Sequence, residues 1–277
     1  MEPFTVGELS RETAWGAALA GVHVVIHTAA RVHVMNETAD NSLDEFRRVN
    51  VQGTLNLARQ AAAAGVRRFI FISSIKVNGE LSRPGQALTA DDVPAPQDPY
   101  GVSKHEAEQG LFELATATGV HVVVIRPVLL YGPGVKANFH SMMRWVQRRL
   151  PLPLGAIDNW RSLVAMDNLL DLIVTCIDHQ RAANQIFLVS DCDDVSLTQL
   201  LRALGWALVR PAWLIPLPAT MLRLAALMVG RRDLAQRLLG SLQVDITKNR
   251  QLLGWTLPVT LSQGLEKASR SLLDDHP

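Results

Sequence analysis

The sequence contains few cysteines and no strong excess of charge of either sign. Its 277 residues include two cysteines, Cys176 and Cys192, whose number and spacing fit neither a disulfide framework nor a zinc site. We therefore expect no metal and a reducing, cytoplasmic location. The formal net charge of +1 gives no electrostatic basis for binding nucleic acid, so no nucleic-acid partner is expected.

Long hydrophobic runs are also missing. The first four residues lack the basic segment and apolar core of a signal peptide, so we expect none. The most apolar stretch, 211–230, contains three prolines and Arg223, and its helical part, 219–229, is too short to span a bilayer. We predict a core or lobe-packing helix there and no stable membrane insertion; a loose membrane-surface contact is the alternative.

Short runs rich in β-branched residues alternate with helical patterns in the first half of the chain. These patterns predict strands at 22–27, 68–73 and 121–126, separated by helices over 43–64 and 98–119. Strands buried on both faces and separated by helices indicate a parallel sheet with right-handed crossovers. The predicted fold class is α/β, a doubly wound parallel sheet of Rossmann type.

Beyond Pro127 the predicted elements are shorter and form a smaller lobe. Residues 130–134 are predicted as a turn-rich loop. A strand is predicted at 185–190, and helices over 138–150, 196–204 and 245–253.

The helix predicted over 98–119 carries a pair of residues suited to proton transfer. Asp98 is a good N-cap and Pro99 a good first residue, which places Tyr100 and Lys104 four apart on one face. An ammonium beside a phenol favours the phenolate, so we predict a lowered pKa for Tyr100. Such a tyrosine can protonate a carbonyl oxygen or deprotonate an alcohol, the chemistry of an oxidoreductase. An ordinary exposed tyrosine near a lysine is the alternative.

Other polar residues are expected near this pair. Ser74 follows a predicted strand at the carboxyl edge of the sheet, where ligands bind in open α/β sheets. Asn50 shares the inward face of its helix with Phe46 and Gly53, so its amide needs partners. Glycine inside a helix costs about 1 kcal/mol, so Gly53 indicates close helix–sheet packing. A purely structural asparagine is the alternative, and His27 is interpreted as structural.

Several short motifs follow one another along almost the whole chain. They are HTAA at 27–30, NVQGT at 50–54, SSIKVNGE at 73–80, Tyr100-x3-Lys104, Arg126-Pro127, YGPG at 131–134, RSLV at 161–164 with Asp167, and Gly254-Trp255 with Pro258. Together they resemble the motifs of the extended short-chain dehydrogenase/reductases of the NAD-dependent epimerase/dehydratase family, which act on nucleotide sugars.

The resemblance implies roles for individual residues. It makes Ser74, Tyr100 and Lys104 the catalytic residues, with Lys104 also holding the nicotinamide ribose. It implies NAD or NADP as cofactor and a UDP-hexose as substrate. The implied substrate-binding residues are Ser74, Asn138 and Arg161. The implied cofactor-binding residues are Glu8, Leu9, Thr28, Ala29, Ala30, Asn50, Ser73, Tyr100, Lys104 and Pro127.

The family's Gly-rich pyrophosphate turn has no counterpart in the sequence. Residues 7–9 (GEL) resemble the family's G-D-L turn after the third strand, with Glu8 in place of aspartate. We therefore expect a truncated dinucleotide-binding domain over 1–130, interleaved with a substrate-binding lobe over 131–277. Cofactor binding by this chain should then be weak, and tight NAD(P) binding in a titration would overturn that expectation.

Three reactions share this family's scaffold. The family's dehydratases carry an acid and a base where this chain has Ile75 and Lys76, so the resemblance argues against dehydration. The run at 73–80 resembles a bacterial O-antigen subgroup that reduces UDP-4-keto sugars, so 4-keto-sugar reduction is the main prediction. A UDP-sugar 4-epimerase and a truncated non-catalytic relative are the alternatives. The choice between NAD and NADP stays open, and the family also implies a homodimer through the helices at 43–64 and 98–119.

Overall fold

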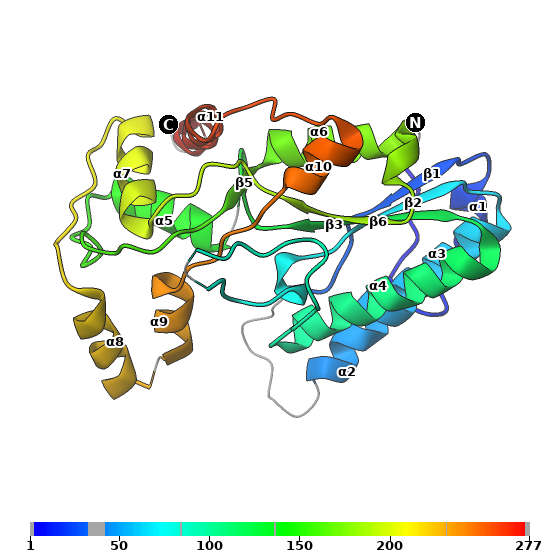
Figure 1. Cartoon of the computed structure of the whole chain (residues 1–277), viewed down its shortest axis with the longest axis horizontal. Coiled ribbons are helices and arrows are strands. Elements are labelled where there is room, and N and C mark those ends of the chain that lie inside the picture. The colour runs from blue at the N-terminus through cyan, green and yellow to red at the C-terminus, as the bar shows by residue number, and fades with distance from the viewer. Residues whose placement is uncertain (1–2, 33–41, 84, 136, 231, 275–277) are drawn as a thin grey trace.

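A parallel sheet forms the centre of the fold in the computed structural model of the protein. The structure describes residues 3–32, 42–83, 85–135, 137–230 and 232–274. Within these, four parallel strands lie in the order β1-β2-β3-β6 (Figure 1). They are Val24–His27, Arg68–Ile72, His121–Pro127 and Gln185–Val189. Each predicted strand is present, and the α/β prediction is confirmed.

The strands direct alternate side chains into two helical layers. Val124 of β3 packs in a core with α3 (Thr54–Ala63) and α4 (Pro99–Thr118). Its neighbour Ile125 packs on the other side with α6 (Met166–Asp178). Figure 1 accordingly shows α3 and α4 below the sheet and α6 above it. The sheet is therefore covered on both faces, as a doubly wound fold requires.

The first turn of α4 forms as its sequence predicts. The Asp98 carboxylate accepts a hydrogen bond of 2.7 Å from the Gly101 N–H, and Pro99 opens the helix. Gly119 ends it in the left-handed region with φ of 78°. These caps fix where Tyr100 and Lys104 emerge, because both lie in the first two turns.

The remaining elements are short. Around the sheet they are α1 (Gly16–Leu19), α2 (Ser42–Phe46), the π-helix η2 (Arg47–Gly53), the 3₁₀ helices η3 (Ile75–Val77) and η4 (Gln180–Ala182), and α10 (Thr247–Leu253). The smaller lobe, on the left of Figure 1, holds the strand pair β4 (Leu129–Tyr131) and β5 (Leu163–Ala165) with the helices α5 (Ala137–Gln147), α7 (Leu197–Ala207), α8 (Ala219–Met228), α9 (Arg232–Leu239) and α11 (Leu261–Asp274).

One prediction for this half is wrong at one end. The loop predicted over 130–134 begins only at Gly132, because Leu129–Tyr131 form β4 and pair with β5. Three-residue strands are too short to give a periodic signal. The helix α8 packs on the lobe as predicted, through the partly buried Ala219, Leu222 and Ala226, but none of its residues is fully buried. Within the described residues, no helix has both the length and the apolarity to cross a membrane.

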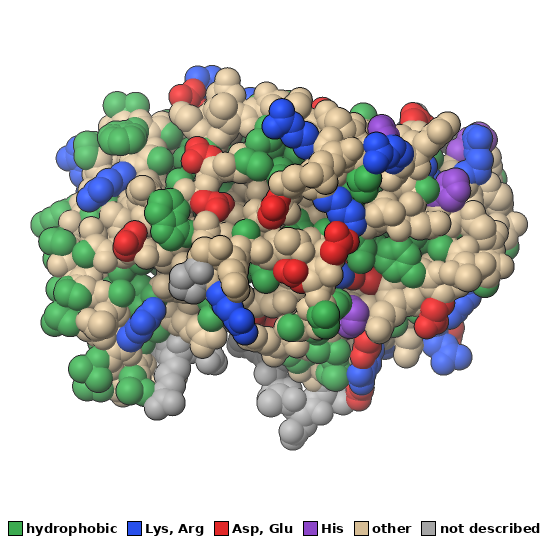
Figure 2. All heavy atoms as spheres, in the orientation of Figure 1, with side chains coloured by type: hydrophobic (Ala, Val, Ile, Leu, Met, Phe, Trp, Pro, Cys, Tyr) green, Lys and Arg blue, Asp and Glu red, His purple; other side chains and the backbone are tan. Residues whose placement is uncertain are grey.

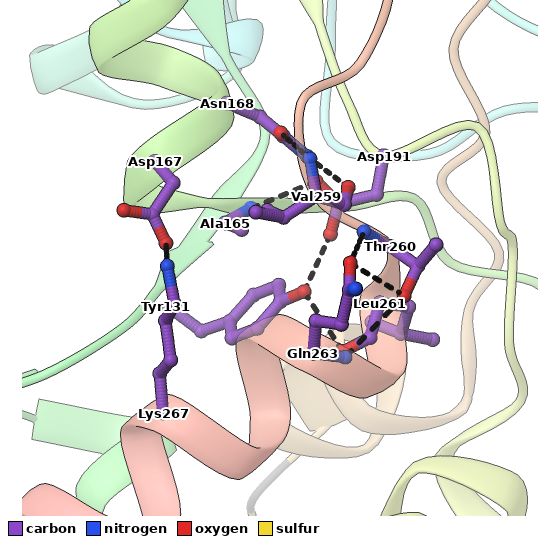
Figure 3. Close-up of polar contacts among 10 residues, drawn as sticks. All are labelled: Tyr131, Ala165, Asp167, Asn168, Asp191, Val259, Thr260, Leu261, Gln263 and Lys267. Atoms are coloured by element: carbon purple, nitrogen blue, oxygen red, sulfur yellow. Dashed lines mark hydrogen bonds and ion pairs between the residues drawn. The ribbon is translucent and has the colours of Figure 1, made fainter.

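A buried polar network fastens the lobe to the end of β6. Figure 3 shows the Tyr131 hydroxyl pointing to the Asp191 carboxylate, to which it donates a hydrogen bond of 2.6 Å. The same carboxylate accepts bonds from the Ala165 N–H and the Asn168 amide. Burial raises the pKa of Tyr131 and, despite these donors, that of Asp191. We therefore interpret Tyr131 as a structural tyrosine, because its hydroxyl is bonded to Asp191 within this network.

Candidate active site

Ser73 and Ser74 lie where β2 ends and η3 begins. Ser74 is extended, and its hydroxyl caps η3 by accepting the Lys76 N–H at 3.3 Å. The Ser73 hydroxyl is buried, and no described residue gives it a hydrogen-bond partner. A Cβ on Gly101 would come within 2.8 Å of the Lys76 carbonyl oxygen, so η3 and the start of α4 are in close contact. This contact brings Ser74 to the same region as Tyr100.

Tyr100 lies in a pocket of aromatic and charged groups. Its ring meets the Phe46 ring edge-on, with centroids 6.1 Å apart. The Lys76 ammonium lies 5.9 Å from the centre of the Tyr100 ring and forms an ion pair with Asp98. No described residue forms a hydrogen bond with the Tyr100 hydroxyl. The phenol is therefore held by its ring and can accept or donate a bond to a ligand.

The predicted lowering of the Tyr100 pKa is wrong for the protein without ligands. Burial raises the pKa of Tyr100 to about 12, and the Asp98 carboxylate adds to the rise. The helical spacing correctly placed a lysine on the same face, but it gave no information on burial or on the neighbouring carboxylate. In this state Tyr100 is a protonated donor at neutral pH.

Lys104 is almost completely buried one turn along α4. Its ammonium lies 4.0 Å from the centre of the Phe71 ring on β2, a cation–π contact. Burial lowers the pKa of Lys104 to about 7, against the opposing effect of the Glu108 carboxylate. The ammonium also helps burial to lower the pKa of His27 to about 4. His27 hydrogen-bonds Thr54 at 2.9 Å and is a neutral structural residue.

This lysine makes the stability of the protein depend on pH. Unfolded chains keep Lys104 protonated up to its ordinary pKa of 10.5, whereas the folded protein loses the proton near pH 7. Between these values the unfolded state binds more protons, so the free energy of unfolding rises with pH. We expect Lys104→Met to be more stable than the wild type in urea denaturation, with the largest margin below pH 7 and a shrinking margin toward pH 10.

Lys248 provides a matched control for this experiment. It pairs with the exposed Asp91 at 2.7 Å on the surface. Lys248→Met is expected to change stability by a similar small amount at all these pH values. If the margin of Lys104→Met over the wild type were equal at about pH 6 and about pH 9, the burial of a charged lysine would be contradicted.

Asn50 joins three parts of the fold from inside a π-helical turn. Its amide donates to the Ser103 hydroxyl on α4 at 3.0 Å and to the Arg31 carbonyl at 3.1 Å, and its oxygen accepts the Arg31 N–H at 2.8 Å. Ser103 in turn donates to the Tyr100 carbonyl at 2.8 Å. The predicted continuous helix over 43–64 is thus interrupted by η2, a form frequent at functional sites.

We expect Asn50→Ala to lower both stability and activity. It removes the hydrogen bonds that Asn50 makes to the Arg31 main chain and to the buried Ser103 hydroxyl, at a cost of about 1–3 kcal/mol. It also frees the segment after β1, which should raise the KM for cofactor. Asn249→Ala is the control, because Asn249 is equally buried and donates to Leu188 in α10 packing. Asn249→Ala should lose stability with unchanged KM; equal KM effects in both variants would contradict the role given to Asn50.

Gly53 and residues 8–9 meet on the neighbouring face of η2. A Cβ on Gly53 would come within 2.8 Å of the Leu9 side chain. The close packing predicted for Gly53 is therefore present, but with Leu9 and its loop rather than with the sheet. Glu8 is exposed and lies 3.6 Å from Arg48 in an ion pair. This loop places Glu8 and Leu9, two of the expected cofactor-binding residues, beside η2.

The remaining predicted residues fall into two groups. Thr28, Ala29 and Ala30 follow β1, and Pro127 ends β3. All four residues therefore lie at the carboxyl edge of the sheet, where Ser73 and Ser74 follow β2. The substrate candidates Asn138 and Arg161 belong to the smaller lobe. Asn138 is in the first turn of α5, with its side chain outside the described part of the structure.

Arg161 is held firmly in the smaller lobe. Its main chain exchanges hydrogen bonds of 3.0 and 3.1 Å with Val195, and its guanidinium donates to the Gly240 carbonyl at 3.4 Å. Burial lowers the pKa of this guanidinium. Arg161 is therefore positioned by contacts within the smaller lobe. Ser74, Tyr100 and Lys104 are positioned by β2 and α4 instead.

One buried ion pair below the site escaped the sequence analysis. Arg126 on β3 donates to Glu108 on α4 at 3.0 and 2.5 Å and to the Asn78 oxygen at 2.9 Å. Asn78 ends η3 and donates to the Thr89 carbonyl at 2.8 Å. The position of Arg126 at the end of a buried apolar strand was the one signal in the sequence that it needs a buried acidic partner. The network ties β3, α4 and η3 together under the candidate catalytic residues.

The residues at this edge suit the nicotinamide end of NAD(P). The buried Lys104 ammonium faces an aromatic ring, while the Glu108 carboxylate is engaged by Arg126. The Ser73 hydroxyl lacks a partner among the described residues, and the exposed Thr28 and Ala29 leave the edge open. Ligand hydroxyl groups can satisfy both polar side chains. The fit is good for this half of a dinucleotide.

Known proteins with similar sequences include epimerases and reductases. The model of the NAD dependent epimerase/dehydratase family matches residues 2–190. A UDP-glucose 4-epimerase from Vibrio cholerae is 49% identical over 271 residues, which cover 98% of this chain and 83% of that protein. A GDP-6-deoxy-D-mannose reductase from Pseudomonas aeruginosa is 26% identical over 284 residues, covering 99% of this chain and 84% of that protein.

The fold is shared with solved members of this group. UDP-glucuronic acid 4-epimerase from Bacillus cereus, in complex with NAD, superposes with a TM-score of 0.77 at 21% identity. The superposition covers 96% of this chain and 79% of that chain. A family match over more than half of the sequence and a relative at 49% identity agree with the motifs and with the site. The chain belongs to the NAD dependent epimerase/dehydratase family.

Proposed function

We propose that the protein is an NAD(P)-dependent 4-epimerase of a UDP-hexose. The observation that carries the proposal is the arrangement of Tyr100 and Lys104 on α4 against Ser74 at the end of β2. A half-buried phenol one helical turn from a buried lysine, at a carboxyl strand edge, is suited to moving a proton at an alcohol carbon. The UDP-glucose 4-epimerase from Vibrio cholerae, 49% identical over almost the whole chain, supports this reaction type.

The chain's own residues would handle the proton and hold the sugar. The Tyr100 phenolate would take the proton from the C4 hydroxyl and later return it to the same oxygen after the ketone has turned over. Ser74 would orient that oxygen by a hydrogen bond, and the Lys104 ammonium would stabilise the phenolate. When bound, the nicotinamide would accept the C4 hydride and return it to the opposite face of the sugar, so that no cofactor is consumed.

The burial of Tyr100 means that ligand binding would have to prepare the phenolate. Without ligands its pKa of about 12 keeps the proton on the phenol, so the resting residue is an acid. Lys104 must be protonated to favour the phenolate. Its pKa of about 7 means that only about half of the molecules carry that charge at neutral pH. Ligand hydroxyl groups that bond to Lys104 would favour its charged form. Cofactor binding would therefore prepare the base.

The two parts of the chain would divide the ligands. We assign the cofactor to residues 1–130, with contacts from Glu8, Leu9, Thr28, Ala29, Ala30, Asn50, Ser73 and Pro127. We assign the UDP-sugar to residues 131–277, with Asn138 and Arg161 near the nucleotide. Arg161 offers a planar fork suited to a diphosphate, and its fixed main chain would keep that fork in place.

Reduction of a 4-keto sugar is the second candidate. The sequence analysis placed it first, and the GDP-6-deoxy-D-mannose reductase relative is the observation in its favour. Its proton chemistry is the same: Tyr100 would donate to the keto oxygen. The difference lies in the cofactor, because a reductase consumes one reduced nicotinamide for each sugar. The relative with the higher identity supports epimerisation, so we place epimerisation first.

The two candidates separate in one pair of assays. The protein is incubated with UDP-glucose and NAD⁺, and UDP-galactose is measured by anion-exchange chromatography. In parallel it is incubated with UDP-4-keto-6-deoxy-GlcNAc and NADH or NADPH, and nucleotide oxidation is followed by absorbance. We expect UDP-galactose in the first assay without net NADH. Nucleotide oxidation in the second with no product in the first would identify a reductase; neither reaction would favour a non-catalytic relative.

A further inference from the structure

The helix α8 exposes a second apolar face. Ala219, Leu222 and Ala226 form the stripe that rests on the lobe. Met221, Leu224 and Met228 lie on a different stripe and are 57%, 59% and 76% exposed. A helix that is apolar on both sides is normally buried on both sides. The outer stripe of α8 therefore lacks a partner within the described residues.

The segment before α8 extends this surface. Trp206 at the end of α7 is 76% exposed, and Val209 and Trp213 are also largely exposed. The main chain here is firmly held, because the Leu152 N–H donates to the Trp213 carbonyl at 2.9 Å and the Ile215 N–H donates back to Leu152 at 2.8 Å. Figure 2 shows hydrophobic side chains gathered along the left edge, where Figure 1 places α7 and α8. These apolar side chains are therefore exposed on a segment whose main chain is held by hydrogen bonds.

The sequence around this surface is rich in arginine and poor in acidic residues. Residues 197–240 contain six arginines, no lysine and one acidic residue, Asp233, giving a net charge of +5. The whole chain has a net charge of +1, so the rest of the molecule carries −4. Arg202, Arg210 and Arg223 are exposed between the apolar side chains. Three arginines thus lie among the exposed apolar side chains of this surface.

We propose that the surface formed by residues 206–229 binds an anionic phospholipid bilayer at its headgroup boundary. Exposed tryptophans beside arginines and a short apolar helix are the composition of interfacial membrane contacts. The ten residues of α8 span about 15 Å, half the thickness of the hydrocarbon core, so the helix would lie in the interface. This inference does not depend on the proposed reaction.

Charge favours a bilayer over a second copy of the chain as the occupant. A symmetric dimer through this surface would bring the exposed arginines of two copies, Arg202, Arg210 and Arg223, against each other. An anionic bilayer attracts the same arginines. The exposed apolar residues on α6 provide a contrast, because Leu170 and Val174 lie on a helix with three aspartates and no basic residue. The negative charge of α6 should repel an anionic bilayer.

Vesicle flotation tests the proposal. The protein is mixed with vesicles of phosphatidylglycerol and phosphatidylethanolamine, or of phosphatidylcholine alone, and the fraction that floats is measured. We expect binding to the anionic vesicles that weakens with added salt, and little binding to phosphatidylcholine. The triple variant Met221→Ser/Leu224→Ser/Met228→Ser should bind about tenfold less or weaker still, because it removes the side chains that enter the interface.

The double variant Leu170→Ser/Val174→Ser on α6 is the matched control. It removes similarly exposed apolar side chains and should bind anionic vesicles as the wild type does. Circular dichroism of both variants checks that they fold. Absence of wild-type binding to anionic vesicles, or unchanged binding by the triple variant, would overturn the proposal. A wild-type dimer that the triple variant converts to monomers would overturn it too, by assigning the surface to a second copy.

Discussion

Replacing Tyr100 with phenylalanine is expected to lower the kcat for chemistry at C4 by about 100- to 10,000-fold. The ring would keep its edge contact with Phe46 and its place under Lys76, so the fold should persist. Only the hydroxyl is lost, and no described residue depends on it for a hydrogen bond. The KM for the sugar should change little. Steady-state kinetics with UDP-glucose would measure both constants.

The second tyrosine of the chain provides the control. Tyr131→Phe removes a hydroxyl that donates to the buried Asp191 at 2.6 Å. That change should lower the free energy of unfolding by about 1–3 kcal/mol, since it leaves a buried carboxylate with one partner fewer. The kcat of the folded variant should stay at the wild-type value. If Tyr100→Phe kept its activity within about tenfold, Tyr100 would not be the proton-transfer residue.

The Arg126–Glu108 pair should produce the largest loss of stability. Both side chains are almost fully buried and form two hydrogen bonds. Removing one partner leaves a buried charge without compensation, at a cost of about 3–5 kcal/mol. We expect losses of this size for Arg126→Met and for Glu108→Leu in urea denaturation. The double variant should recover much of the loss, because an apolar pair leaves no buried charge.

A surface pair of similar geometry sets the baseline. Lys267 and Asp167 lie 2.8 Å apart with both side chains largely exposed (Figure 3). Lys267→Met should therefore cost at most about 1 kcal/mol. If the double variant at Arg126 and Glu108 lost as much as the two single variants added together, the two charges would not be compensating each other. Arg126→Met should also lower kcat, because Arg126 holds Asn78 at the end of η3.

Local signals were sufficient to predict the framework around the site. The Asp98 cap and Pro99 start α4 where the sequence indicates, and Gly119 ends it. The apolar runs that became β2 and β3 are buried on both faces and could not be confused with surface strands. Caps and buried runs depend on neighbouring residues alone, which explains why one sequence is enough for them.

The features that escaped prediction depend on contacts between distant segments. The π-helix η2 forms where Asn50 bonds to Arg31 and to Ser103, two residues far from it in sequence. The pKa of Tyr100 rises because the folded chain buries its phenol beside Asp98. The strand pair β4–β5 joins segments separated by the helix α5 and the loop that follows it. In each case tertiary packing decided the outcome.

The stretch from 211 to 230 illustrates a different limit. Its hydrophobicity predicted a packed helix, and length excluded a membrane span. Composition alone does not say whether an apolar helix meets its own protein or another surface. In the structure only one stripe of α8 is in contact with the lobe, and the arginines around the other stripe suggest the second answer.

One isotope measurement tests the central claim most directly. The protein is given UDP-glucose carrying deuterium at C4, together with unlabelled NAD⁺, and the product sugar is analysed by mass spectrometry and proton NMR. An epimerase that moves the hydride away from C4 and back again should give UDP-galactose with deuterium retained at C4, and Tyr100→Phe should form almost none. UDP-galactose that had lost the deuterium, or deuterium accumulating in free reduced nucleotide, would contradict the account.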